Sequence, residues 1–256
     1  MSRLGDLRFL ATCFDLSDPE ERGRSARLLA GFYSDLVTAI KPELVAEIGA
    51  FDASFSRDIK RRLPNTHAIA FEANPYNYEA FAPDAAAAGV EYVHAAVSDA
   101  VGSVTFNIIA SYGDQKFTRV KGVDSLLQRT AAGVTYEQVT VPATTADVVL
   151  GHSRFATGSV CLWIDVEGAV EKVLRGATQT LHKAKSIMVE VEDYAQWEGQ
   201  WLSANVDAML AEYGFSPIAR DFEYEHQYNV VYVTADVMSN FWYDQHLTRF
   251  FSALRK

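Results

Sequence analysis

The chain is constrained most by the stretch after Pro42, where short apolar segments alternate with amphipathic ones. Helical patterns separate most of five strand-like segments, which are 44–48, 67–71, 90–97, 160–166 and 186–191. Two further segments, 216–220 and 229–233, follow each other with no helix between them. Strands separated by helices indicate a parallel sheet with right-handed crossovers. We therefore predict an α/β protein whose seven-stranded, mostly parallel sheet closes with an antiparallel pair.

Helical patterns precede and follow this predicted sheet. Asp18 and Pro19 give a typical helix start, and apolar residues then recur at helical spacing as far as Ile40. Residues 236–256 are amphipathic and rich in aromatic side chains, so we expect them to dock on their own domain or on a dimer partner rather than on a membrane. No linker or repeat divides the chain. We therefore predict one domain with three parts: a helical N-terminal extension (1–42), an α/β core (43–235) and a C-terminal helix (236–256).

Charge and composition limit the partners of the chain. The formal net charge is −10, whereas proteins that bind duplex nucleic acid concentrate Lys and Arg to neutralise phosphates. No apolar run approaches the roughly 18 to 20 residues that span a bilayer, and the N-terminus lacks the features of a signal peptide. Cys13 and Cys161 have neither metal-like nor CxxC spacing. We therefore expect a cytoplasmic protein that binds no nucleic acid and does not span a membrane.

A glycine turn after the first predicted strand indicates a cofactor site. Glu47 lies near the end of this strand, Gly49 permits a sharp turn and a close approach to a ligand, and a helix begins near Ser54. Backbone amides at such a helix start can receive a ligand carboxylate. Glu72 ends the second strand, where an acid accepts both hydroxyls of an adenosine ribose in nucleotide-binding βαβ units.

The composition of this turn favours S-adenosylmethionine over a dinucleotide. A dinucleotide fingerprint needs G-x-G-x-x-G, because side chains would obstruct the pyrophosphate. This turn has one glycine and carries Phe51 and Ser54 where the others should be. S-adenosylmethionine has no phosphate, and its sulfonium and ammonium groups suit the acidic Glu47 and Asp52. We therefore predict S-adenosylmethionine as the cofactor.

The carboxyl ends of the predicted strands should form the ligand-binding rim, because open α/β sheets bind ligands where the strand order reverses. This rule places Glu47, Glu72 and Asp165 along one rim, together with Ser98 or the backbone near Val97, which would contact adenine. Residues 107–138 carry the least certain pattern, and we expect them to cover the sheet edge or the mouth of the site. Tyr194, Trp197 and Trp201 follow the fifth strand and form either a wall that stacks on an acceptor or ordinary packing.

A second segment, from Trp163 to Ala169, presents carboxylates to the place where chemistry should occur. Asp165 is the first candidate for a general base. Glu167 is another candidate, although it also suits a helix start. Glu190 on the neighbouring strand and His226 between the closing strands follow, with His226 equally interpretable as a simple loop residue. No spacing argues strongly for a metal, so we predict none, and Mg²⁺ held by Asp165 and Glu190 is the alternative.

Six segments occur in a fixed order between about Val45 and Val233: Glu47–Ala50, Phe71–Pro75, Ala96–Asp99, Thr145–Asp147, Ile164–Ala169 and Val173–Ala177. In this order they resemble the FkbM-type methyltransferases. The resemblance implies the Rossmann-like fold of class I methyltransferases. It also implies cofactor contacts at Glu47, Gly49, Glu72 and Ser98, and a reaction centre at Asp165 and Glu167.

The chain departs from this family pattern at several positions. Phe51, Asp52 and Ala53 stand where the family usually has Asn, a variable residue and Gly. Trp163 replaces a frequent Lys, and Val170 replaces a common Glu. The turn must therefore form without a second glycine, and a cation near the reacting oxygen is lost.

The resemblance implies methyl transfer to a hydroxyl of a sugar, glycan or glycosylated secondary metabolite. A homodimer is the arrangement in which residues 236–256 would dock on a second copy of the chain. Alternatives are an N- or protein methyltransferase on the same fold and a non-catalytic protein that binds S-adenosylmethionine. The candidate catalytic residues are Asp165, Glu167, Glu190 and His226. The predicted cofactor contacts are Glu47, Gly49, Ala50, Phe51, Ser54, Glu72, Ala73, Asn74, Val97, Ser98 and Asp165.

Overall fold

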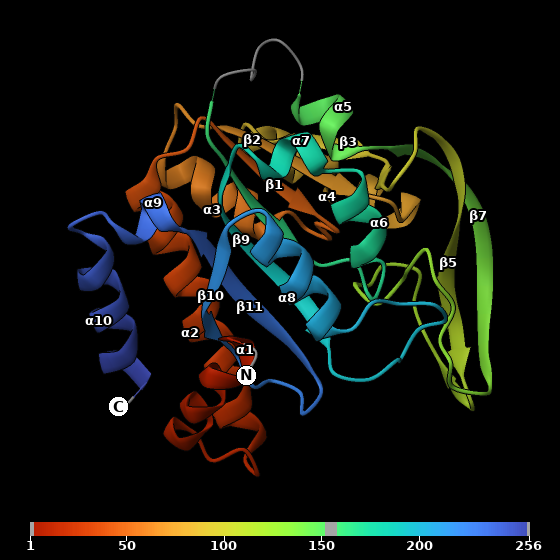
Figure 1. The fold of residues 1–256 in the computed structure, drawn as a ribbon. Helices are drawn as coiled ribbons and strands as arrows, with labels where there is room; N and C mark the ends of the chain where they lie inside the picture. The colour runs from red at the N-terminus through yellow and green to blue at the C-terminus, as the bar shows by residue number, and fades with distance from the viewer. Residues whose placement is uncertain (1–2, 152–157, 255–256) are drawn as a thin grey trace.

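The computed structural model describes residues 3–151 and 158–254 (Figure 1). The outermost residues of the expected terminal segments, 1–2 and 255–256, lie outside the described residues. A seven-stranded sheet forms the centre, in the order β10-β11-β9-β8-β1-β2-β3. Its strands are β1 (Leu44–Ile48), β2 (His67–Glu72), β3 (Glu91–His94), β8 (Val160–Ile164), β9 (Ala184–Glu192), β10 (Phe215–Arg220) and β11 (Gln227–Thr234).

The connectivity of this sheet confirms the predicted Rossmann-like class. β1 pairs in parallel with β2 on one side and with β8 on the other, so the strand order reverses between them. β11 is antiparallel to both of its neighbours, β9 and β10, and supplies the predicted closing pair. All five residues of β1 are buried, as expected of a parallel strand that is covered on both faces.

Helices cover both faces of the sheet (Figure 1). Right-handed crossovers place α3 and α4 on one face and α6, α7 and α8 on the other. Their bounds are α3 (Ser54–Arg62), α4 (Pro75–Ala87), α6 (Val170–Arg175), α7 (Thr178–Leu181) and α8 (Ser203–Glu212). The remaining helices are α1 (Arg3–Asp6), the 3-10 helix η1 (Leu7–Cys13), α2 (Pro19–Ile40), α5 (Ala146–Leu150), α9 (Ala235–Met238) and α10 (Tyr243–Leu254). None of these described helices is both long and apolar enough to cross a membrane.

The N-terminal helix α2 begins where the sequence predicts, with the Asp18 side chain accepting from the backbone amide of Glu20. Its middle is fixed to the sheet, because the buried Tyr33 hydroxyl donates to the carbonyl of Leu162 in β8 at 2.5 Å. The C-terminal segment is two helices, α9 and α10, rather than one. α10 packs on α2, where the rings of Phe32 and Phe250 stack with centroids 4.6 Å apart.

A second sheet of four strands, in the order β4-β7-β5-β6, is the main departure from the predicted arrangement. Its strands are β4 (Ala96–Val97), β5 (Gly102–Tyr112), β6 (Gln115–Lys116) and β7 (Val134–Thr144). The predicted strand 90–97 is therefore divided between two sheets. β5 and β7 form a long antiparallel pair at the right of Figure 1. Only two of the eleven β7 residues are buried, so its sequence lacks the apolar pattern by which a strand is recognised.

Candidate active site

The first cavity lies at the carboxyl ends of the central strands. Six predicted cofactor contacts line it, and they are Gly49, Phe51, Glu72, Ala73, Val97 and Asp165. Asp165 and Glu167 line it after β8. Lys121, Gly122, Asp124 and Leu126 complete the wall. This cavity therefore lies where the strand order reverses, as the topology requires.

The turn after β1 is tightly packed and conformationally unusual. Gly49 has φ +80°, and a Cβ at this position would lie 1.6 Å from the carbonyl oxygen of Asp165. Phe51 (φ +45°) and Ala53 (φ +56°) also adopt left-handed conformations, which cost L-residues roughly 1–2 kcal/mol. These are the two positions where the family pattern has Asn and Gly, the residues that tolerate such backbone best. The chain forms the same kind of turn at the expense of local strain.

Glu72 joins the turn to the second strand. Its Oε2 accepts from the amide of Phe51 at 2.8 Å, and its Oε1 accepts from the amide of Asn74 at 2.6 Å. Burial raises the pKa of Glu72 to about 7. Each carboxylate oxygen can accept more than one hydrogen bond. Glu72 therefore keeps acceptor capacity toward the first cavity.

Glu47 is placed differently from its predicted role. The residue is 5% exposed and does not line the first cavity. Its Oε2 accepts from the amide of Ser56 in α3 at 2.8 Å, and burial raises its pKa to about 7. Glu47 therefore anchors the start of α3 to β1, and it does not line the first cavity.

Four further predicted contacts are not among the residues that line the first cavity. Ala50 is packed in the core, and Ser54 is exposed at the start of α3. Asn74 is fully buried and caps α4 by accepting from the amide of Tyr76 at 2.9 Å. Ser98 is buried and donates to Asp99 at 2.9 Å.

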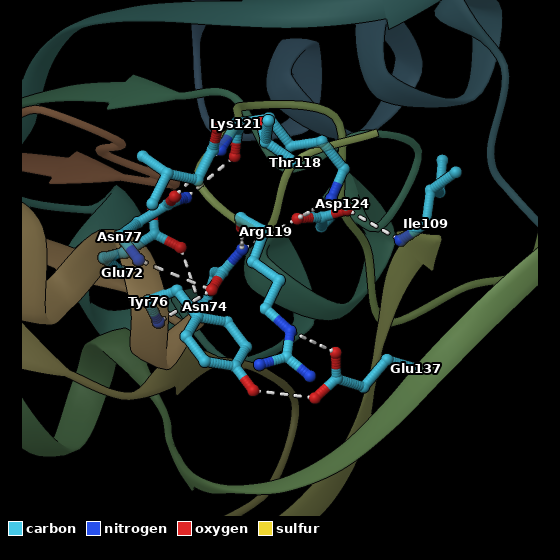
Figure 2. Close-up of polar contacts among 11 residues, drawn as sticks. Glu72, Asn74, Tyr76, Asn77, Ile109, Thr118, Arg119, Lys121, Asp124 and Glu137 are labelled. Carbon is cyan, nitrogen blue, oxygen red and sulfur yellow. Dashed lines mark hydrogen bonds and ion pairs between the residues drawn. The ribbon is translucent and has the colours of Figure 1, made fainter. Parts of the chain in front are cut away.

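The segment 117–126 closes the first cavity from the side of the second sheet (Figure 2). The Asn74 side chain donates to the Arg119 carbonyl at 2.9 Å and to Asp124 Oδ2 at 2.8 Å. Asp124 Oδ1 accepts from the amide of Ile109 in β5 at 2.8 Å, and Lys121 Nζ lies 2.9 Å from the same oxygen. Part of 107–138 thus reaches the mouth of the site, as expected. The pairing of Asn74 with Asp124 spans 50 residues, so sequence spacing gave no sign of it.

Three carboxylates form what we term the acid cluster: Asp165, Glu167 and Glu190, each with an oxygen within 4.8 Å of the others. β8 and β9 pair so that Ile164 lies opposite Val189, which brings the next residues, Asp165 and Glu190, side by side. Glu167 follows in a left-handed conformation (φ +50°). Its carbonyl is held by the hydroxyl of Ser125 at 2.7 Å. Strain at such a position is typical of residues held for function.

Burial and mutual repulsion dominate the electrostatics of the acid cluster. Burial, with the charge of Glu167 next, raises the pKa of Asp165 to about 8. The pKa values of Glu167 and Glu190 are raised well above their usual range by burial and by neighbouring carboxylates. The Arg129 guanidinium lies 3.4 Å from Glu167 Oε2, and its positive charge lowers the pKa of Glu167 against these raising effects. A carboxyl group with a pKa near neutrality is suited to general acid–base work.

The second cavity lies between α2 and the sheet. It is lined by Gly23, Ala26, Arg27, Leu29 and Ala30 of α2, by Trp163, Asp165, Met188 and Glu190 of the β8 and β9 region, and by Asp221, Glu223 and Asn229 near the closing pair. Asp165 lines the first cavity as well. The acid cluster therefore lies where the two cavities meet.

The remaining predicted site residues lie elsewhere. His226 lies in the bend before β11, and its ring contacts that of Tyr194 with centroids 4.8 Å apart. Trp197 is fully buried beneath Arg129, whose guanidinium lies 3.8 Å from the ring centroid. Tyr194 lines a separate depression with Tyr112, Phe117 and Gln196 among others. Of the predicted aromatic wall, Trp197 is therefore packing.

The sequence of the chain matches a family of known proteins. The family model described as "Methyltransferase FkbM domain" matches residues 43–217. The chain belongs to this family. The assignment identifies an S-adenosylmethionine-dependent methyltransferase and agrees with the resemblance inferred from the ordered segments. No protein of curated function matches the sequence.

Solved structures similar to the chain include several methyltransferases. Methyltransferase FkbM from Methylobacillus flagellatus is 9% identical, with a TM-score of 0.46 over 75% of this chain and 44% of that one. Precorrin-6y C5,15-methyltransferase from Geobacter metallireducens is 13% identical, with a TM-score of 0.36 over 74% and 78%. An O-methyltransferase family protein from Burkholderia thailandensis is 7% identical, with a TM-score of 0.42 over 84% and 58%. The chain thus spans about half the length of the first and third of these proteins.

Proposed function

We propose that the chain is an O-methyltransferase that transfers the methyl group of S-adenosylmethionine to a hydroxyl of a sugar, glycan or glycosylated metabolite. The observation that carries this proposal is the position of Asp165, which lines both cavities. A methyl donor in the first cavity and an acceptor in the second would meet at this residue.

In this proposal the first cavity holds the cofactor. Glu72 accepts the ribose hydroxyls, and Ala73 and Val97 lie beside the adenine. Phe51 and Gly122 both line this cavity and lie against each other, since a Cβ on Gly122 would lie 3.8 Å from the Phe51 ring. The methionine part then extends past Gly49 toward Asp165, with its positive groups directed to the acidic end of the cavity.

The proposed reaction is an in-line displacement. The acceptor oxygen attacks the methyl carbon, the carbon–sulfur bond breaks, and its electron pair stays on sulfur in the S-adenosylhomocysteine that leaves. The hydroxyl proton passes to Asp165, with Glu167 and Glu190 as the alternative bases. Alignment of oxygen, carbon and sulfur should supply most of the acceleration, and the base roughly 10²- to 10⁴-fold.

The second cavity supports a polyhydroxylated acceptor. Glu190, Asp221 and Asn229 offer oxygen acceptors along one side, and Trp163 offers an apolar face. The nearby Asp193 carboxylate already accepts from the hydroxyl of Ser203 at 2.8 Å. The acidic wall would repel a polyphosphate backbone, which favours glycans over nucleic acids.

An acceptor screen tests this proposal. Purified protein and labelled S-adenosylmethionine are incubated with sugars, nucleotide sugars and glycosylated metabolites, alongside RNA, DNA and a protein extract. Each active sugar is paired with its deoxy analogue, which a site built to bond hydroxyls should reject. Methylation of protein or nucleic acid, with none on any glycan, would overturn the acceptor assignment. Absence of S-adenosylmethionine binding in calorimetry would overturn the cofactor assignment.

A further inference from the structure

Beside the acid cluster lie buried carboxylate oxygens that have no hydrogen-bond donor. Within residues 3–151 and 158–254, Glu190 Oε2 and Glu192 Oε1 are buried and find no partner. Glu192 is 1% exposed, and only its other oxygen is bonded, by the Gln200 amide at 2.9 Å. A buried acceptor without a donor is unfavourable by roughly 1–3 kcal/mol, and by more when it is charged. These oxygens are therefore placed for a ligand that supplies positive charge.

The sheet register directs Glu192 toward the cluster. Glu190 and Glu192 are two residues apart in β9 and so share one face. Gln227 of β11 lies opposite Glu192, and its amide reaches Glu167 Oε2 at 3.5 Å. The charge of Glu192 also acts on Asp165 and Glu167. Four carboxylates therefore converge from β8, β9 and the turn after β8.

The protein supplies little charge to balance these four groups. Among the described residues, Arg129 is the cation paired with the cluster, and it lies at 3.4 Å, near the long end of the ion-pair range. The same guanidinium also rests on the Trp197 ring. Buried carboxylates without a counter-charge are strongly unfavourable. The sulfonium of S-adenosylmethionine would bring one positive charge without a hydrogen-bond donor, and its ammonium would bring a second charge with donors. Together with Arg129 these groups still leave the four carboxylates short of one positive charge.

We propose that Asp165, Glu167 and Glu190 bind a divalent cation of the Mg²⁺ or Ca²⁺ class, with Glu192 as a nearby reserve of negative charge. The donor set consists of carboxylate oxygens with no His or Cys, which selects hard cations over zinc. Ligand oxygens at about 2.4 Å from one cation lie at most about 4.8 Å apart. The oxygens of the acid cluster satisfy this limit. The proposal replaces the expectation, drawn from sequence spacing, that no metal is bound.

The role of this cation rests on the proposed function. At the junction of the two cavities it would bind the acceptor hydroxyl, hold it toward the methyl group and make its proton more acidic. Asp165 would bind the cation through one carboxylate oxygen, and its second oxygen would take the proton. Three protein oxygens leave coordination positions open for such a ligand. The cation would also neutralise the cluster, which otherwise repels any deprotonated acceptor oxygen.

Terbium luminescence measures the binding directly, without cofactor or acceptor. Tb³⁺ replaces Ca²⁺ at oxygen sites, and Trp163 on the wall of the second cavity is placed to sensitise its emission. We expect saturable emission from the intact protein, reversed by Ca²⁺ or Mg²⁺. Glu190→Gln should weaken Tb³⁺ binding at least tenfold, and Asp165→Asn provides a second variant if the first fails to fold. Glu198→Gln, an exposed acid outside both cavities, is the matched control.

The outcomes separate this proposal from the proposed function. Equal Tb³⁺ affinity in the intact protein and in both cluster variants would overturn the cation site. Full methyl transfer after thorough treatment with EDTA would overturn its role and leave the methyltransferase intact. Normal Tb³⁺ binding with no methyl transfer to any glycan would leave the site standing and remove the proposed acceptor.

Discussion

The buried carboxylates near β1 and β2 differ from those near β8 and β9 in what they already bind. Glu47 and Glu72 accept from backbone amides at 2.6–2.8 Å. Glu190 and Glu192 each keep a buried oxygen without a donor among the described residues. Burial raises the pKa of both groups, so exposure does not explain the contrast. The acids near β1 and β2 therefore stabilise the fold through hydrogen bonds to backbone amides. The acids on β9 keep unbonded oxygens that a ligand can use.

The largest effect is expected where the two regions touch, at Gly49. Its backbone lies against the Asp165 carbonyl, and φ is +80°. Gly49→Ala should therefore destabilise the protein by at least about 4 kcal/mol, because strain and a backbone clash act together. Urea unfolding followed by circular dichroism measures this loss. Gly31→Ala is the control, since nothing lies within 4 Å of a Cβ in that helix, and it should be neutral or stabilising by up to about 1 kcal/mol.

Asp165→Asn separates catalysis from stability. If ligands rather than the fold use this carboxylate, turnover should fall by at least about 10² while cofactor affinity stays within a few fold. Thermal stability measured at pH 9, above the pKa of about 8 for Asp165, should be unchanged or higher, because the substitution then removes one charge from a buried, mutually repelling group. Steady-state kinetics and a melting curve on the same preparation check both parts. Full activity would move the role of base to Glu167 or Glu190.

Glu72→Ala should affect both properties, because this carboxylate belongs to the fold and faces the cofactor. Loss of charge-assisted ribose bonds should weaken S-adenosylmethionine binding about ten- to a hundredfold. Loss of the bonds to the Phe51 and Asn74 amides should lower the unfolding free energy by about 1–3 kcal/mol. Calorimetry and denaturant unfolding measure the two effects. An unchanged dissociation constant would show that Glu72 does not bind the ribose.

The smallest expected effect is a pH dependence of cofactor binding. Burial raises the pKa of Glu72 to about 7, and ribose hydroxyls donate best to the charged carboxylate. Binding should therefore favour the deprotonated form and tighten roughly five- to tenfold from pH 6 to pH 7.5. Glu72→Gln should flatten this profile. A slope that survives in Glu72→Gln would assign the proton to another group, such as Asp124.

The sequence predicted the central sheet well because its strands are buried on both faces. Such strands read as continuous apolar runs, as in 44–48 and 186–191. The second sheet escaped prediction because most of β7 (Val134–Thr144) is not buried. The break between β3 and β4 at Ala95 also has no local signal, since no glycine or proline interrupts residues 91–97 and only pairing with different partners separates the two strands.

Predicted site residues that follow directly from strand ends are among those that line the first cavity. Gly49, Glu72 and Asp165 lie on the first cavity because strand ends of a parallel sheet share one edge. Ser98 lies close in sequence to this edge, but its hydroxyl turns to Asp99. Nothing in the sequence indicated Asp124, because this residue reaches the site through an irregular loop that no periodic pattern marks.

The position of α2 has a consequence for how the proposed acceptor cavity can change in evolution. In the proposed arrangement, the cofactor is held by residues within the matched family region, 43–217. One wall of the acceptor cavity comes instead from α2, Pro19–Ile40, which precedes that region. Changes in Ala26, Arg27 or Ala30 can reshape the acceptor cavity while the methyl donor site stays intact. A lineage of such enzymes can therefore acquire new substrates by exchanging one N-terminal helix.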